Sequence, residues 1–137
     1  MKISDYLSSP RSITIGLPQG SCLGPLLYLI YVNDLPNISN TTFPILYADD
    51  TTLCLRNDNI HNLIYQANQE LKTFQDWSTA NRLTINTEKT FTMTVTNKRL
   101  PDFIPETTLG QITIPSLGSC KFLGITLDNK LTFKSHM

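Results

Sequence analysis

The sequence carries no excess of either charge. Its 137 residues include 11 lysines and arginines and 11 aspartates and glutamates, giving a formal net charge of +0. Domains that bind nucleic acid often have a basic surplus. If this chain binds nucleic acid, most of the phosphate contacts must therefore come from elsewhere or from a local patch. The only local basic group, at Lys98 and Arg99, is typical of a solvated surface.

Cysteine is also scarce. Cys22, Cys54 and Cys120 are widely spaced and odd in number, so neither a zinc-binding spacing nor a disulfide framework is visible. We expect buried structural thiols in a reducing compartment.

Long apolar runs are absent too. The longest, at residues 26–32, is too short to span a membrane. The first residues lack the apolar core of a secretory signal. We therefore expect no membrane partner and an intracellular protein, nuclear or cytoplasmic, that is not secreted.

Hydrophobic residues nevertheless make up 40% of the chain, which is enough to build a core in one domain or in a fragment of a larger one. A helix at 60–74 is the clearest element, because apolar residues recur there at steps of three and four. Residues 26–32 predict a buried helix, with a buried strand as the alternative. Strands are expected at 11–15, 83–85, 91–95, 112–114 and 121–127. This order predicts an α+β domain with helices packed on an antiparallel sheet.

Two adjacent carboxylates, Asp49 and Asp50, lie between the strand-like runs 45–48 and 51–55, where a hairpin would turn. Burying unpaired charges is costly, so the pair indicates an external partner. Carboxylate oxygens suit Mg²⁺, which proteins usually hold with one or two carboxylates and substrate phosphates. The alternative is ordinary turn chemistry, since Asp is a common turn residue.

Five motifs in order extend this interpretation to the whole chain. They are Gly-Leu-Pro-Gln-Gly-Ser-Cys-Leu-Gly-Pro-Leu-Leu at 16–27, Tyr-Val-Asn-Asp-Leu-Pro at 31–36, Tyr-Ala-Asp-Asp at 47–50, Asn-Thr-Glu-Lys-Thr at 86–90 and Phe-Leu-Gly-Ile-Thr-Leu-Asp at 122–128. Together they resemble the palm of reverse transcriptases from non-LTR retrotransposons, near the jockey-like group. The resemblance implies an RNA-directed DNA polymerase with a palm-like antiparallel sheet and helices on one face.

The resemblance also implies roles at the reaction centre. Asp49 and Asp50 would be metal ligands and catalytic residues of a two-metal site, with Mg²⁺ or Mn²⁺ as the cofactor. Lys89 would protonate the departing pyrophosphate as a general acid. A solvated turn lysine is the alternative for Lys89.

Further residues would bind the substrates. Pro18, Gln19 and Gly20 would line the pocket for nucleotide and template, with an ordinary loop as the alternative. Tyr47 would pack near the primer end or in the core. A primer grip would be formed by Phe122, Leu123 and Gly124. Asp34 and Asp128 are expected to be structural.

The same resemblance predicts that residues 1–137 are a partial reverse transcriptase domain, truncated at both ends. A third metal-binding Asp and the fingers would lie upstream, and the thumb downstream. We therefore expect the full-length parent to bind RNA template, DNA primer and dNTP, and the isolated chain to be inactive. The alternative is a non-catalytic remnant of a transposable element that binds nucleic acid or protein.

Overall fold

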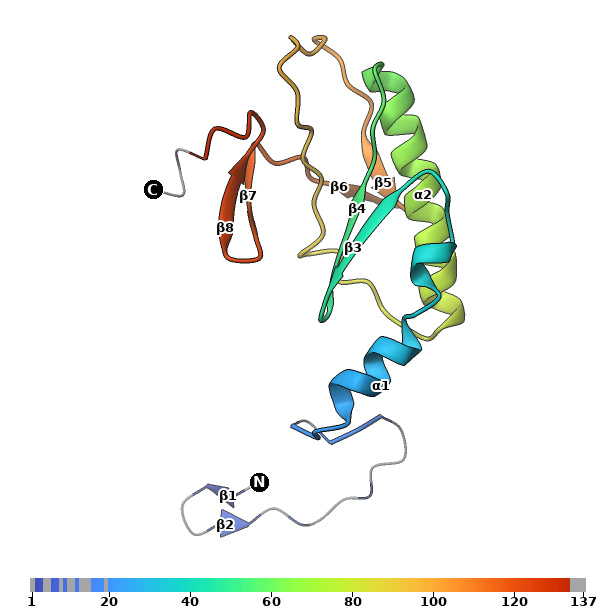
Figure 1. Cartoon of the computed structure of the whole chain (residues 1–137), viewed down its shortest axis with the longest axis vertical. Helices are drawn as coiled ribbons and strands as arrows, with labels where there is room; N and C mark the ends of the chain where they lie inside the picture. The colour runs from blue at the N-terminus through green and yellow to red at the C-terminus, as the bar shows by residue number, and fades with distance from the viewer. Residues whose placement is uncertain are drawn as a thin grey trace. The chain divides into compact units, whose positions relative to one another are not determined.

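The computed structural model describes residues 2–3, 6–7, 9, 12, 16–18 and 20–133, and Figure 1 shows its helices and strands. The chain divides into two compact units, Met1–Asp34 and Leu35–Met137. Both contain helix and antiparallel strand, so the predicted α+β class is confirmed.

In its described residues, the first unit contains two short strands and one helix. Strand β1 (Lys2–Ile3) pairs antiparallel with β2 (Tyr6–Leu7), and α1 spans Gly24–Tyr31. Pro25 lies in the first turn of α1, where its missing N–H costs no hydrogen bond. The predicted strand at 11–15 lies outside the described residues, except for Ser12.

The prediction of a helix at 26–32 is confirmed, but its predicted burial is wrong. No residue of α1 is buried, and Leu29 and Ile30 are among its exposed apolar side chains. A helix that is apolar on all sides needs neighbours on all sides. This short unit supplies too little chain to provide them.

In its described residues, the second unit begins with a 3₁₀ turn, and its long helix follows two strands and precedes four more. These elements are η1 (Leu35–Asn37), β3 (Phe43–Tyr47), β4 (Asp50–Cys54), α2 (Ile60–Ala80), β5 (Thr107–Leu109), β6 (Ile112–Ile114), β7 (Ser119–Phe122) and β8 (Ile125–Asp128). The strands pair as β3–β4, β5–β6 and β7–β8, each as a separate antiparallel ladder. Within the described part of the chain they do not join into the single sheet that we expected.

Helix α2 confirms the clearest sequence pattern and extends six residues past it. Its N-cap is Asn59, whose side chain accepts hydrogen bonds from the backbone N–H groups of His61 (2.9 Å) and Asn62 (3.2 Å). This cap satisfies donors that the first turn leaves without partners. The helix ends at Ala80, and Asn81 is its C-cap.

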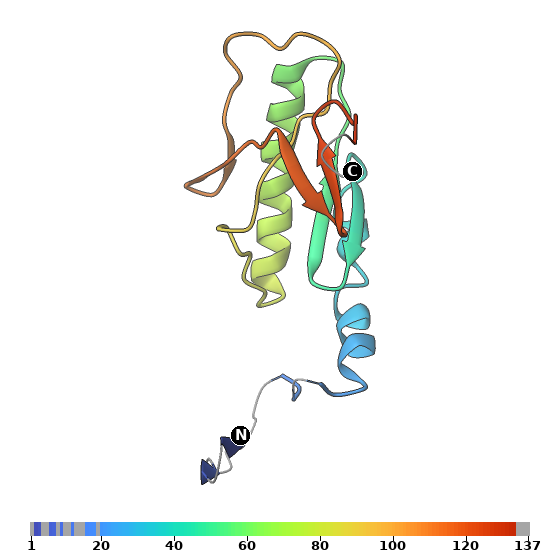
Figure 2. The same cartoon turned by 90° about the vertical axis from the view of Figure 1, so that its left-hand side faces the viewer.

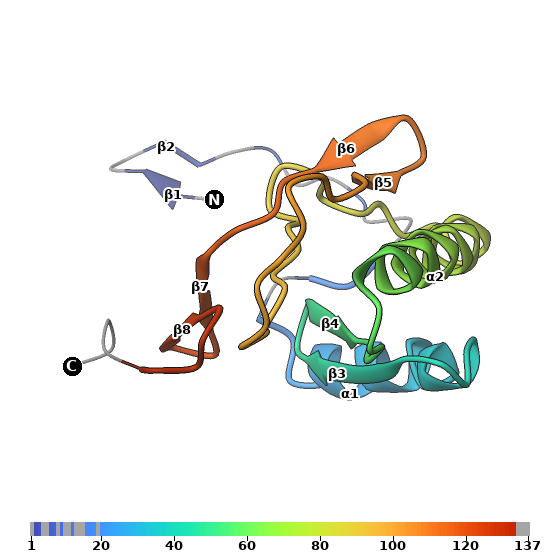
Figure 3. The same cartoon turned by 90° about the horizontal axis from the view of Figure 1, so that it is seen from above.

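The core of the second unit lies where α2 meets the β5–β6 ladder. Ile64 of α2, Leu109 of β5 and Ile114 of β6 are buried. The side chain of Asn68 adds directed bonds at this junction, because Nδ2 donates to the carbonyl of Glu106 (3.1 Å) and Oδ1 accepts from the N–H of Thr108 (2.8 Å). Figure 3 shows β5–β6 and β3–β4 on different sides of α2.

Gly110 allows the β5–β6 turn to approach α2 closely. It begins the two-residue turn between β5 and β6, with φ of 62°, and a Cβ there would lie 3.2 Å from Nε2 of Gln75. An alanine would therefore be strained by its backbone and crowded by α2.

Three predicted strands are wrong. Residues 83–85 form no strand, and residues 91–95 contribute only an isolated parallel bridge between Thr92 and Ser116. Alternation marks a half-buried segment, but a strand also needs a neighbouring backbone to pair with. The expected strand at 121–127 is instead the β7–β8 hairpin, whereas the strand at 112–114 is confirmed as β6.

The predicted burial of the thiols is wrong for two of them. Cys22 and Cys54 are exposed, and Cys120 is half-buried with its Sγ 3.9 Å from the sulfur of Met93. Cys54 is exposed because it lies on the open face of its hairpin, opposite Phe43. In the described part of the chain, no helix has both the length and the apolarity needed to cross a membrane.

We predict that Asn68→Ala lowers the free energy of unfolding by about 1–3 kcal/mol, because its hydrogen bonds to the backbone of Glu106 and Thr108 are lost. Urea unfolding followed by circular dichroism measures the change. Asn62→Ala, on the exposed side of the same helix, is the matched control and should have little effect. Equal loss in both variants would contradict the role of Asn68.

Candidate functional site

The acid pair lies at the tip of the β3–β4 hairpin, as the sequence predicted. Strands β3 and β4 pair from Phe43 opposite Cys54 to Tyr47 opposite Asp50, which leaves Ala48 and Asp49 as a two-residue turn. Ala48 has φ of 50°, in the region that tight hairpin turns require. Asp49 and Asp50 are both exposed.

The two faces of this hairpin differ in exposure. Directly opposite residues share a face, so three opposite pairs lie on one side. The pairs at its two ends, Phe43 with Cys54 and Tyr47 with Asp50, are exposed, and the middle pair, Ile45 with Thr52, is half-buried. Pro44, Leu46, Thr51 and Leu53 on the other side are half-buried. Tyr47 is 63% exposed, so its alternative interpretation as a core residue is wrong. Its contact with a primer stays a prediction.

The donor set of the tip fits a divalent cation only in part. Two adjacent carboxylates match the oxygen ligands that Mg²⁺ prefers, together with water and phosphate. No group of three or more His, Cys, Asp and Glu side chains in the described ranges could hold a metal ion. The tip therefore offers two protein ligands from one hairpin, and a third would have to come from elsewhere.

The glycine-bounded loop before α1 is shaped by its glycines. Gly16 and Gly20 have φ of 83° and 84°, a backbone conformation that glycine adopts without strain. The carbonyl of Pro18 accepts a hydrogen bond from the N–H of Ser21 (3.1 Å). Pro18 and Gly20 are exposed, and Gln19 lies outside the described residues.

Lys89 is exposed at the end of a turn that Asn86 organises. Oδ1 of Asn86 accepts from the N–H groups of Glu88 (3.1 Å) and Lys89 (3.2 Å), and its carbonyl accepts from Oγ1 of Thr90 (2.7 Å). The predicted turn is confirmed. The role of Lys89 as a general acid stays a prediction.

The expected primer-grip residues form the end of a hairpin. Phe122 is the last residue of β7, and Leu123 and Gly124 are the turn, with φ of 47° and 85°. Two consecutive positive φ values, with Gly second, are typical of a type I′ turn. Leu123 is exposed there.

The predicted site residues thus fall into separate groups. Tyr47, Asp49 and Asp50 share one hairpin, Phe122 to Gly124 share another, and Pro18 and Gly20 belong to the first unit. In the second unit, polar residues that the sequence analysis did not single out attach α2 to segments beside it. Asn57, Gln66 and Asn68 are examples: each makes a side-chain bond that links α2 to a neighbouring segment. An asparagine or glutamine on the apolar flank of an amphipathic helix is the signal that could have found two of them.

Asp128 has the structural role that the sequence predicted. It ends β8, and its carboxylate accepts hydrogen bonds from the N–H groups of Lys130 (2.9 Å), Thr132 (3.0 Å) and Phe133 (3.0 Å) and from the hydroxyl of Thr132 (2.9 Å). The Thr132 N–H is the largest influence lowering the pKa of Asp128 below its ordinary value of 3.8; desolvation opposes it.

We predict that the loop after β8 loses order in acid. A lowered folded-state pKa means that the bonded carboxylate stabilises the fold above pH 3.8, and that this contribution is lost as the pH falls through the folded pKa. Amide chemical shifts of Thr132 and Phe133 followed against pH measure this. In Asp128→Asn the two shifts should already differ at neutral pH. An Asp128 carboxyl that titrates at or above its ordinary value would contradict the prediction.

Comparison with known proteins agrees with the motifs. The family described as reverse transcriptase (RNA-dependent DNA polymerase) matches residues 2–127. The chain is 33% identical, over 144 aligned residues and its full length, to the RNA-directed DNA polymerase from mobile element jockey of Drosophila melanogaster. It is 35% identical, again over its full length, to the probable RNA-directed DNA polymerase from transposon BS of the same species. No solved structure matches the chain.

These relatives are much longer than the chain. The alignment covers 16% of the length of each of the two polymerases. The family match nevertheless includes four of the five motifs in full and the fifth up to Leu127, from the glycine-bounded loop through the acid hairpin to the β7–β8 turn. The chain therefore belongs to the reverse transcriptase (RNA-dependent DNA polymerase) family.

Proposed function

We propose that this chain forms part of the nucleotidyl-transfer centre of a retrotransposon's RNA-directed DNA polymerase, which copies RNA into DNA. The observation that carries the proposal is the placement of Asp49 and Asp50 at the exposed tip of a hairpin, in a chain of the reverse transcriptase family. The names of the relatives, RNA-directed DNA polymerases of mobile elements, support the same activity.

Asp49 and Asp50 would bind the cation, which would be Mg²⁺ or, as a substitute, Mn²⁺. When bound, the metal would activate the primer 3′-hydroxyl and stabilise the leaving pyrophosphate. The protein's part is mostly positioning, as in other phosphoryl transfers. A short turn between two paired strands restricts where the two carboxylates can lie, which favours that role.

The other residues would surround the substrates. Pro18, Gln19 and Gly20 would contact the nucleotide and template, and Tyr47 the primer end. Lys89 would donate a proton to the leaving pyrophosphate, and Phe122, Leu123 and Gly124 would hold the primer backbone. This arrangement requires the separate ladders to be completed into one palm-like sheet by further strands of a larger polymerase domain, of which residues 1–137 would be a part.

We predict that Asp49→Asn abolishes polymerisation. The test replaces the matching segment of the jockey polymerase with this chain and measures single-nucleotide incorporation on an RNA template. Loss of a metal ligand removes several kcal/mol of transition-state stabilisation, so the rate should fall at least about 100-fold. Asp102→Asn, which changes an exposed loop carboxylate, is the matched control. An active Asp49→Asn chimaera would disprove the proposal.

The isolated chain is expected not to extend a primer with Mg²⁺ or Mn²⁺, because only two carboxylates come together in the part that the structure describes. A primer-extension assay on an RNA template checks this, with the intact chimaera as the positive control. Extension that Asp49→Asn abolishes would show that two ligands suffice. Two results together would favour the non-catalytic alternative. The chimaera would be inactive, and the folded chain would bind RNA in a gel-shift assay.

We also propose an intracellular location, nuclear or cytoplasmic, because template and primer must be present with the enzyme. Fractionation of cells that express the tagged chain checks this.

A further inference from the structure

The acid hairpin has little support from the sheet. In the described residues β3 pairs only with β4, so the ladder has two strands and no third. An isolated two-stranded hairpin is marginally stable in water. What fixes the position of Asp49 and Asp50 must therefore be sought outside the ladder. Figures 1 and 2 both show the hairpin running alongside α2.

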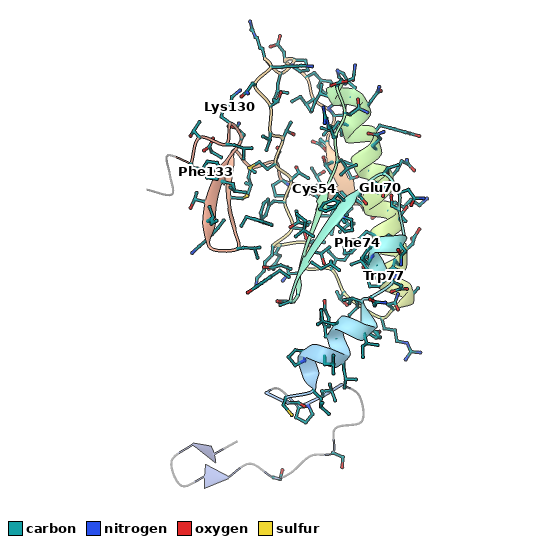
Figure 4. All side chains as sticks on the ribbon, viewed as in Figure 1. Cys54, Glu70, Phe74, Trp77, Lys130 and Phe133 are labelled. Carbon is teal, nitrogen blue, oxygen red and sulfur yellow. The ribbon has the colours of Figure 1, made fainter. Side chains whose placement is uncertain are left out.

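Both legs of the hairpin carry a side-chain hydrogen bond to α2. Before β3, Oγ1 of Thr41 donates to Oε1 of Glu70. After β4, Nδ2 of Asn57 donates to Oε1 of Gln66 (3.1 Å). We call these two bonds the hairpin tethers. Figure 4 labels Cys54 at the end of β4 and Glu70 on α2.

The acceptors of the two tethers lie on one face of the helix. Gln66 and Glu70 are four residues apart, which places them one turn apart on the same side of α2. Two attachment points on a rigid rod restrain rotation of the hairpin as well as its distance from the helix. A single point would let the tip swing.

Asn57 and Thr41 are themselves held in place. Oδ1 of Asn57 accepts from the N–H of Asn59 (2.9 Å), the residue that caps α2. The N–H of Thr41 donates to Oγ of Ser39 (3.0 Å). The tethers therefore join short ordered turns, rather than free side chains, to the helix.

Apolar packing alone would not fix the orientation of the hairpin on α2. The half-buried face of the hairpin, with Leu46 and Leu53, contributes burial that has no directional preference. A hairpin held only in that way can slide or rotate over its neighbour. Hydrogen bonds depend on direction, so the tethers select one orientation.

We propose that Thr41, Asn57, Gln66 and Glu70 are positioning residues that fix the angle of the β3–β4 hairpin on α2 and so set the place of the two carboxylates. The inference rests on the proposed function for its catalytic consequence, but the orientation of the hairpin can be measured without any activity. Misplacing a reacting group by about 1 Å can cost 10²-fold in rate, so loose tethers should reduce turnover without removing any ligand.

The chain offers variants that separate the tethers from the local turns. Asn57→Asp keeps the oxygen that accepts from Asn59 but loses the donor to Gln66. Gln66→Glu keeps an acceptor for Asn57 and should be tolerated, whereas Gln66→Ala is not expected to be. Gln69→Ala, three residues along the same helix and exposed, is the matched control. At the other leg, Thr41→Val removes the donor and Thr41→Ser keeps it.

The first measurement is the distance between two spin labels in the 137-residue chain. The labels are attached at Tyr47→Cys, near the tip, and at Lys72→Cys, on α2. The three native cysteines are replaced by serine. Asn57→Asp, Gln66→Ala and Thr41→Val should broaden the distance distribution. Gln66→Glu, Thr41→Ser and Gln69→Ala should leave it narrow. Circular dichroism should show the same helix content in all variants. Narrow distributions in the tether variants would overturn the proposal.

The second measurement is single-nucleotide incorporation by the polymerase chimaera. The tether variants should lower kcat by about 10- to 100-fold with KM for template–primer unchanged, and the conservative variants should restore it. Broadened distances with unchanged kcat would overturn the positioning role. If the distances broaden in the 137-residue chain but Asp49→Asn leaves the activity of the chimaera unchanged, the proposed function is disproved and the tethers remain supported as a structural device.

Discussion

The side chain of Asn68 makes the contact on which the second unit most depends. Its amide bonds to the carbonyl of Glu106 and the N–H of Thr108, as a neighbouring strand would. Because both bonds are directional, they fix where β5–β6 lies along α2, and the buried side chains of Ile64, Leu109 and Ile114 then meet at one place. Figure 3 shows β5–β6 and β3–β4 on different sides of α2.

The acid hairpin is also attached to α2 by side-chain hydrogen bonds, but this attachment is weaker. Its bonds come from side chains on both partners, and its tip carries charge rather than apolar surface. Carboxylates that bind a cation must stay accessible to water and substrate, so the tip cannot be buried for stability. Support at the base of the hairpin reconciles accessibility with a defined position.

Much of the site could be predicted from the sequence, and less of the fold. Asp49 and Asp50 at a hairpin tip, helix α2 and the turn at Asn86 to Lys89 all follow from local signals: alternation, helical period and capping residues. Residues 83–85 and 91–95 alternate just as clearly and form no ladder, because strand formation depends on a partner that is distant in sequence. The Leu123–Gly124 turn was missed because Gly after Leu inside an apolar run looks like strand.

The sequence by itself determined the family, since five motifs in order identify a reverse transcriptase and the family match covers residues 2–127. It also determined which carboxylates lie together, because adjacent residues in a tight turn cannot separate. Only the tertiary structure decided that α2 is the common support of β3–β4 and β5–β6, and that Asn57, Gln66 and Asn68 provide it. Those bonds join residues 9 to 40 positions apart, and no local pattern encodes which polar side chains meet across such a separation.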